Sequence, residues 1–278
     1  MFYIILFAIV LLFVSRIVLD QIENNTFQDD FTNQPVIFLD SNKFIDFIQN
    51  DQDGYIQSLS TFDLIARKVG SAKEYIEKIC KDTKNNKEPI SFSLKKKIEL
   101  CCKRADGFFT KTAIVSKFYN KNIEDIPWNI AVFKTQFYEE GIPHTRMKTI
   151  FLQQDYIEKL SKTQLTSLLI HEKVHIFQRY HQDPDIIYDL GFRRISKKNA
   201  DMFVRSNPDL DDYVYIDILD YKTMVKKYTS IYPKSINDVI EPLKNNMIHK
   251  YEHPYEYIAY QVEREYETDH LRRSKKED

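Results

Sequence analysis

The chain has 278 residues, a formal net charge of −1 and 43% hydrophobic residues. This size and apolar content suffice for one large domain, or two small ones, with a proper core. The near-neutral charge excludes the strong positive field that draws a protein to nucleic acid, so no nucleic-acid partner is expected.

An apolar segment occupies residues 1–19. A helix of this length crosses a bilayer core of about 30 Å. A cleaved signal peptide would need basic residues before the apolar run and a small-residue cleavage site after it, and the sequence has neither. Residues 1–19 are therefore predicted to be an uncleaved, single-pass transmembrane anchor. Arg16 is the only basic residue nearby, which leaves the side of the membrane open.

Residues 20–125 have the pattern of a mainly helical region. Thr61, Ser71 and Ser93 each precede an apolar periodic segment and are predicted to be helix N-caps. No pattern typical of catalysis occurs here, so we expect a scaffold, with a removable pro-segment as the alternative.

Three cysteines leave the redox state open. Cys80, Cys101 and Cys102 form an odd set without a C-x-x-C pair. One alternative is a disulfide from Cys80 to either of the others. The other is three buried free thiols, because Cys101 falls on a helix-like apolar stripe with Leu94 and Ile98.

Residues 126–278 are predicted to form a separate α+β domain. Segments 128–133 and 148–153 are rich in Ile, Val and Phe and are expected to be strands. His144 lies between them in a turn-like stretch and is expected to be a loop histidine without a metal role. Further along, we expect a short helix over 195–205 and a strand over 213–219 that pairs with 221–228.

The central motif is His171-Glu172-Lys173-Val174-His175, an H-E-x-x-H pattern within an apolar periodic segment. Residues four apart lie on the same helix face, so the two imidazoles can bind one metal ion. Glu172 is one step round the helix, where its carboxylate can reach a water on that ion. Ser161 and Gln164 form a capping-box pattern that predicts the start of this helix. The pattern indicates a Zn²⁺ site with a glutamate as general base.

A catalytic zinc normally has three protein ligands, and two candidates compete for the third position. His181 has the spacing of the H-E-x-x-H-x-x-G-x-x-H pattern, but Gln178 replaces the glycine that would let the chain leave the helix. A continuing helix rises about 1.5 Å per residue and would carry position 181 away from the metal. Glu256 is the other candidate, in the first turn of a helix that begins at Pro254.

The position of Glu256, three residues before the small Ala259, resembles the gluzincin metallopeptidases. In that family a glutamate on a downstream helix joins the two motif histidines on zinc. The resemblance implies a zincin-like domain with His171, His175 and Glu256 as zinc ligands and Glu172 as the catalytic base. Two features depart from it: Glu256 lies 81 positions after His175, and residues 1–125 match nothing in the family. Lesser rivals for the third ligand are Glu252, Glu263 and Glu265.

The sequence therefore predicts a membrane-anchored zinc metallopeptidase acting on a peptide or protein substrate. The strand before the metal helix is expected to be the sheet edge with which an extended peptide pairs. The histidine ligands need hydrogen-bond acceptors behind them. The candidates for this role are Asp201, Asp209 and Asp217.

Two alternatives stay open at this point. One is a catalytically silent zincin-fold protein that serves as a membrane-tethered interaction module. The other is an anchored helical protein without a metal site. The intact Glu172 weighs against the silent protein, because a module that does not turn over substrate has no use for the base.

Overall fold

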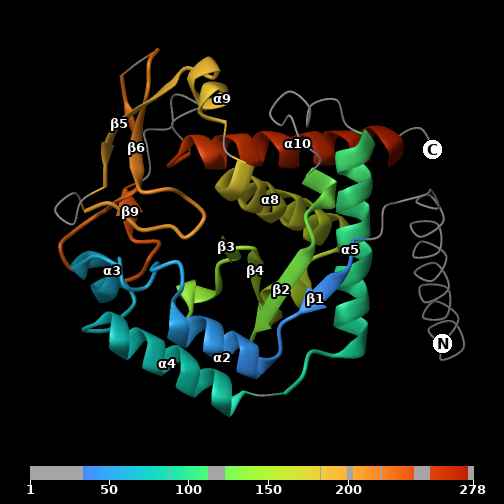
Figure 1. Cartoon of the computed structure of the whole chain (residues 1–278), viewed down its shortest axis with the longest axis horizontal. Coiled ribbons are helices and arrows are strands. Elements are labelled where there is room, and N and C mark those ends of the chain that lie inside the picture. The colour runs from blue at the N-terminus through green and yellow to red at the C-terminus, as the bar shows by residue number, and fades with distance from the viewer. Residues whose placement is uncertain are drawn as a thin grey trace, which may run out of the picture. The chain divides into compact units, whose positions relative to one another are not determined.

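A computed structural model describes residues 34–86, 88–111, 123–181, 183–198, 203–219, 221–240 and 251–274 (Figure 1). The transmembrane anchor predicted for residues 1–19 lies outside these ranges. In the part of the chain that the structure describes, no helix combines the length and apolarity needed to cross a membrane. One compact unit spans Gln34–Asp278, so strands and helices from the predicted helical region belong to the same unit as the motif helix.

The chain is an α+β protein built on a mixed sheet. Four strands form this sheet in the order β1-β2-β4-β3 among the described residues. They are β1 (Val36–Phe38), β2 (Trp128–Phe133), β3 (His144–Arg146) and β4 (Thr149–Gln153). Strand β2 pairs in parallel with β1 and with β4, whereas β3 is antiparallel to β4. The strands predicted over 128–133 and 148–153 are thus confirmed as β2 and β4.

Helices surround this sheet (Figure 1). The α-helices are α2 (Ser41–Asn50), α3 (Thr61–Ala66), α4 (Ala72–Asn85), α5 (Phe92–Lys111), α7 (Gln154–Lys159), α8 (Lys162–His181), α9 (Pro184–Asp189) and α10 (Pro254–Ser274). Two short 3-10 helices are η1 (Ile123–Asp125) and η2 (Glu139–Gly141).

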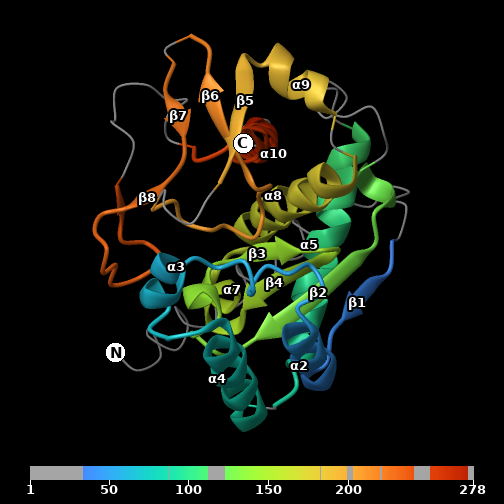
Figure 2. The ribbon, with the colours of Figure 1, turned by 60° about the vertical axis from the view of Figure 1, so that its left-hand side comes forward.

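The side chains of β2 and β4 alternate between two cores. Ile130 and Ile150 belong to a core shared with α5, α8 and α10. Ala131 and Phe151 belong to a second core shared with α2 and α4. The sheet is therefore a middle layer with helices on both faces, as Figure 2 shows. This arrangement packs the motif helix α8 against the sheet on one side and against α10 on the other.

The helix caps were predicted in part. Ser71 caps α4 as expected, because its hydroxyl accepts a hydrogen bond from a backbone N–H of the first turn. The predictions for Thr61 and Ser93 are wrong. Ser60 caps α3 in a reciprocal capping box, and Ser91 is the hydroxyl that accepts from the first turn of α5. In both cases the capping hydroxyl belongs to a residue one or two positions earlier, and Ser60 has the extended backbone that a cap requires.

A second, antiparallel sheet lies beside α9 and α10. Its strands are β5 (Phe192–Lys197), β6 (Tyr213–Asp217) and β7 (Thr223–Met224), and a separate two-stranded pair is formed by β8 (Lys227–Tyr228) and β9 (Val239–Ile240). The strand predicted over 213–219 is observed as β6, and its pairing with 221–228 is confirmed only for β7, because β8 pairs with β9 instead. The short helix predicted over 195–205 is wrong, because β5 occupies 192–197 and pairs with β6. Most side chains of β5 are exposed, so pairing overrides a weak local pattern.

The three cysteines are free thiols buried in the protein. Cys80 belongs to the core beneath α2 and α4, whereas Cys101 and Cys102 belong to the core around α5 and α8. The sheet separates these two cores, and the disulfide alternative is thereby excluded.

Candidate metal centre

The motif helix α8 begins as predicted from its capping box. Ser161 Oγ accepts from the Gln164 N–H at 3.2 Å, and Gln164 Oε1 accepts from the Ser161 N–H at 2.9 Å. The helix then continues without a break through Gln178 to His181. All five motif residues, from His171 to His175, are buried. The helix is thus a rigid platform whose position is fixed by the core on several sides.

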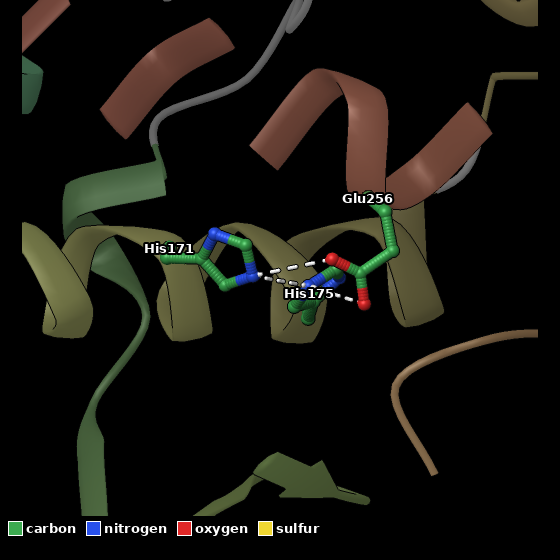
Figure 3. A group of neighbouring side chains, drawn as sticks. All are labelled: His171, His175 and Glu256. Atoms are coloured by element: carbon green, nitrogen blue, oxygen red, sulfur yellow. Dashed lines mark hydrogen bonds and ion pairs between the residues drawn. The ribbon is translucent and has the colours of Figure 1, made fainter. Parts of the chain in front are cut away.

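Helices α8 and α10 bring three metal-ligating side chains to one point. His171 Nε2 lies 3.0 Å from His175 Nε2. The Glu256 carboxylate lies 3.6 Å from His171 Nε2 and 3.9 Å from His175 Nε2. Figure 3 shows the carboxylate reaching down from α10 to the two imidazoles on α8. The structure therefore brings together the three residues that the sequence predicted as ligands.

These separations fit a four-coordinate zinc ion. Bonds of about 2.0–2.1 Å to a tetrahedral Zn²⁺ place the ligand atoms about 3.4 Å apart. The closest approaches between the three side chains scatter around that value. They are 3.0 Å between the two Nε2 atoms, 3.6 Å from His171 Nε2 to Glu256 Oε2 and 3.9 Å from His175 Nε2 to Glu256 Oε1. Imidazole nitrogen and carboxylate oxygen are also ligand types that zinc accepts. The donor set satisfies the size and the chemistry of a three-protein-ligand site that leaves a fourth position open.

The far side of each imidazole is held by an acceptor. His171 Nδ1 lies 3.1 Å from Glu263 Oε2, and His175 Nδ1 lies 2.9 Å from Gln178 Oε1. Because a carboxylate and an amide oxygen only accept, both Nδ1 atoms carry the proton. Each Nε2 then faces the cluster, where its lone pair is the histidine donor that binds a metal. The two Nε2 atoms lie 3.0 Å apart, within hydrogen-bond distance, so a single proton or a cation can bridge them.

The acceptors predicted behind the histidines are wrong where they can be checked. Asp209 bonds to Thr145 and Asp217 to the backbone N–H of Leu219. Asp201 lies outside the described residues. The sequence positions of the two observed acceptors, Glu263 and Gln178, could have indicated their role. Gln178 lies one turn after the second motif histidine on α8 and shares a helix face with it. Glu263 lies two helical turns after Glu256 on α10, so it lies on the face of α10 that is turned toward the motif helix.

Gln178 also explains why His181 does not complete the site. The Gln178 amide nitrogen donates to the backbone carbonyl of Tyr255 at 3.1 Å, which ties α8 to the first turn of α10. His181 lies at the end of α8 with its ring beside Phe177, and the cluster of candidate ligands does not include it. The residue that replaces the glycine therefore fixes Glu256 beside the two histidines.

Glu256 is anchored as a carboxylate. Asn207 donates to Glu256 Oε1 at 3.1 Å. Burial acts to raise the pKa of Glu256, but contacts with His171 and His175 outweigh burial and hold the pKa well below its usual value. For His171 burial acts in the opposite direction and lowers the pKa. Hydrogen bonds to Glu256 and Glu263 outweigh burial and raise the pKa of His171 well above its usual value. This concentration of negative charge favours a cation at the cluster.

Glu172 has the surroundings of a general base. Its side chain is buried, and its Oε2 has no hydrogen-bond partner in the structure. Burial and the negative charge of Asp209 raise the pKa of Glu172 well above its usual value. Perturbed carboxyl groups of this kind are typical of functional sites.

A cavity of about 480 Å³ opens beside the cluster. Its lining includes Glu172, two candidate metal ligands (His171 and Glu256), and Tyr260, whose ring lies 4.6 Å from the His171 ring. His144 also lines this cavity, in strand β3 and fully buried, so the prediction of a loop position is wrong. It is not part of the metal cluster. The cavity is large enough for a small ligand or the end of a peptide.

The sheet edge differs from the expectation. The strand before α8 is β4, which is buried throughout and lies between β2 and β3. The edge is β3, and its middle residue Thr145 already has partners. The Thr145 N–H donates to Asp209, and the Thr145 carbonyl accepts from Arg179 at 3.3 Å. An incoming strand finds these two main-chain groups occupied.

Comparisons of the chain with protein-family models, with curated proteins and with solved structures give no significant match. A functional interpretation therefore rests on the geometry and chemistry of the site.

Proposed function

We propose that the chain is a zinc-dependent metallopeptidase of the gluzincin type, with a zincin-like arrangement of small sheet, motif helix and C-terminal ligand helix. His171, His175 and Glu256 would hold the zinc, and Glu172 would be the catalytic base. The observation that carries the proposal is the convergence of three ligand side chains whose closest approaches are near the ligand separations of a tetrahedral site. The unpartnered, buried Glu172 beside them supports hydrolysis rather than a structural metal.

Each protein group around the cluster would have a separate role in the reaction. Zinc bound by the three ligands would polarise a peptide carbonyl and acidify a water molecule. Glu172 takes a proton from the attacking water and delivers it to the nitrogen of the leaving amine. Because burial raises its pKa, the Glu172 carboxyl can retain the proton between these two events. Glu263 and Gln178 keep the imidazoles in the tautomer that exposes Nε2.

The membrane anchor is part of the same proposal. Residues 1–19 would tether the catalytic unit to a bilayer, so that the peptidase acts on peptides or proteins near a membrane surface. This tether rests on the apolar run alone.

Replacement of Glu172 by glutamine tests the proposal. The purified protein should contain one zinc per chain, and Glu172→Gln should keep that zinc. Its peptidase activity should fall by about 10²- to 10⁴-fold, the usual contribution of a general base. Glu158→Gln on the exposed face of α7 is a matched control that should leave activity unchanged. Absence of stoichiometric zinc, or full activity of Glu172→Gln, would overturn the proposal.

The occupied edge of β3 favours a second candidate, a zincin-fold protein that binds partners at the membrane without cleaving them. In gluzincin-type peptidases an extended substrate needs an edge, and here Asp209 and Arg179 take the main-chain groups of Thr145. This candidate predicts bound zinc but no turnover of any peptide in a diverse pool, whereas the peptidase cleaves at least one.

A further inference from the structure

Two cations lie next to one another in the wall of the cavity. Val204 and Lys227 form an antiparallel bridge, and the Arg205 N–H donates to the Lys226 carbonyl at 2.9 Å. Arg205 and Lys226 are therefore opposite each other in this pairing, and side chains of opposite residues project to the same side. Both residues line the cavity that contains Glu172.

Like charges at opposite positions destabilise an antiparallel pair unless an anion compensates them. Glu252 forms an ion pair with Arg205 through Nη2, while the buried Arg205 Nε has no hydrogen-bond partner among the described residues. Lys226 has no ion pair with any residue that the structure describes. The Lys226 ammonium and the Arg205 Nε–H can thus both donate to a ligand, and one carboxylate can accept from both.

The two cations are close to the metal centre. Asn207 donates to both Glu252 and Glu256, so the ion-paired partner of Arg205 and the candidate zinc ligand share one hydrogen-bond donor. The charge of Lys226 acts on the Glu256 carboxylate as well. A group bound by Arg205 and Lys226 would therefore lie within reach of a peptide bond at the zinc.

We propose that Arg205 and Lys226 form a carboxylate-binding subsite that selects peptides with a carboxylate next to the scissile bond. The selection of substrates for cleavage rests on the proposed peptidase function, whereas the binding of a carboxylate does not. The carboxylate comes either from the C-terminus of a short peptide or from an aspartate or glutamate side chain. Main-chain groups of the β3 edge are occupied, so they are not available to pair with an extended substrate. The charged subsite would hold the substrate instead.

Binding to a protein that cannot hydrolyse the ligand separates this inference from the reaction. Zinc-loaded Glu172→Gln is titrated by calorimetry with N-acetyl-trialanine as the free acid and as the C-terminal amide. A third probe, N-acetyl-Ala-Glu-Ala-amide, carries the carboxylate on a side chain. At least one of the two carboxylate peptides should bind about 10- to 100-fold more tightly than the trialanine amide, as expected for hydrogen bonds to a charged group.

Variants at the subsite identify its residues. Lys226→Gln in the same background should abolish the preference for the carboxylate, whereas Lys227→Gln, on the adjacent exposed residue, should preserve it. Arg205→Lys keeps the charge but loses the guanidinium fork, so it should reduce the preference while circular dichroism reports the fold.

Equal affinity of the acid and amide peptides would overturn the subsite, and so would an unchanged preference in Lys226→Gln. A preference that disappears in Lys226→Gln but not in Lys227→Gln supports it even if the wild-type protein hydrolyses no peptide. Peptide hydrolysis without any carboxylate preference would overturn the subsite alone and leave the proposed peptidase standing.

Discussion

Replacing Gln178 by leucine removes two hydrogen bonds that connect the candidate metal centre to α10. Gln178 Oε1 accepts from His175 Nδ1 at 2.9 Å, and the amide nitrogen donates to the Tyr255 carbonyl at 3.1 Å. Leucine has nearly the same volume but no polar atoms. The buried imidazole N–H would then have no partner, which costs about 1–3 kcal/mol. The Tyr255 carbonyl would lose one of its two donors but keep the helical hydrogen bond within α10.

The effect on zinc follows from the imidazole. Loss of an acceptor behind a histidine ligand typically weakens metal binding by about 10- to 100-fold, which corresponds to about 1.4–2.7 kcal/mol. We therefore expect Gln178→Leu to lower zinc affinity by this factor in a competition titration against a chromophoric chelator. Gln154→Leu is the control, since among the described residues the Gln154 side chain bonds only to Glu158 on α7.

The substitution Gln178→Glu separates the two roles of Gln178, which are accepting from His175 and donating to the Tyr255 carbonyl. Gln178→Glu keeps an acceptor for His175 but has no donor for the Tyr255 carbonyl. Its zinc affinity should stay near that of the wild type, while the free energy of unfolding of the metal-free protein should fall. If Gln178→Leu bound zinc as tightly as the wild type and was merely less stable, Gln178 would serve only the packing of α8 against α10, and the reasoning would be wrong.

Three further outcomes are expected. Glu256→Ala should lose stoichiometric zinc while His181→Ala keeps it; the reverse result in metal analysis would move the third ligand to His181. Burial lowers the pKa of His144, so the unfolded chain takes up the proton first as pH falls. Stability should then decrease below pH ~6.5, and His144→Phe should remove up to about 1.4 kcal/mol per pH unit of that slope in denaturant titrations. Lys173→Met leaves Asp106 buried without its cation and should cost about 3–5 kcal/mol of unfolding free energy, part of which the added Asp106→Asn change should recover.

The motif and the position of the third ligand could be predicted because each follows from local rules. The capping box at Ser161 fixes where α8 begins, and helical spacing fixes which face carries the two histidines. The choice of Glu256 over His181 followed from Gln178, which cannot provide the turn that a glycine allows. The structure brings Glu256, and not His181, to the motif histidines.

The surroundings of the cluster could not be predicted in the same way. Asp209 was a reasonable acceptor by composition, but its carboxylate bonds to the edge strand β3 through a contact between residues 64 positions apart. Strand β3 has three residues, too few for an alternation pattern to appear. Strand β5 exposes most of its side chains and therefore shows no difference between a buried and an exposed face. These elements are fixed by tertiary contacts rather than by local sequence.

The two positions that the H-E-x-x-H pattern leaves unspecified are not free in this chain. Lys173 is fully buried, with its ammonium paired to Asp106 and lying 4.2 Å from the centre of the Trp128 ring. Val174 is equally buried in the main core. If the proposed peptidase function is correct, relatives without activity would be expected to keep the lysine and valine while the histidines and glutamate vary. Among such relatives, the lysine and valine would indicate common ancestry, and the histidines and glutamate would indicate whether activity is retained.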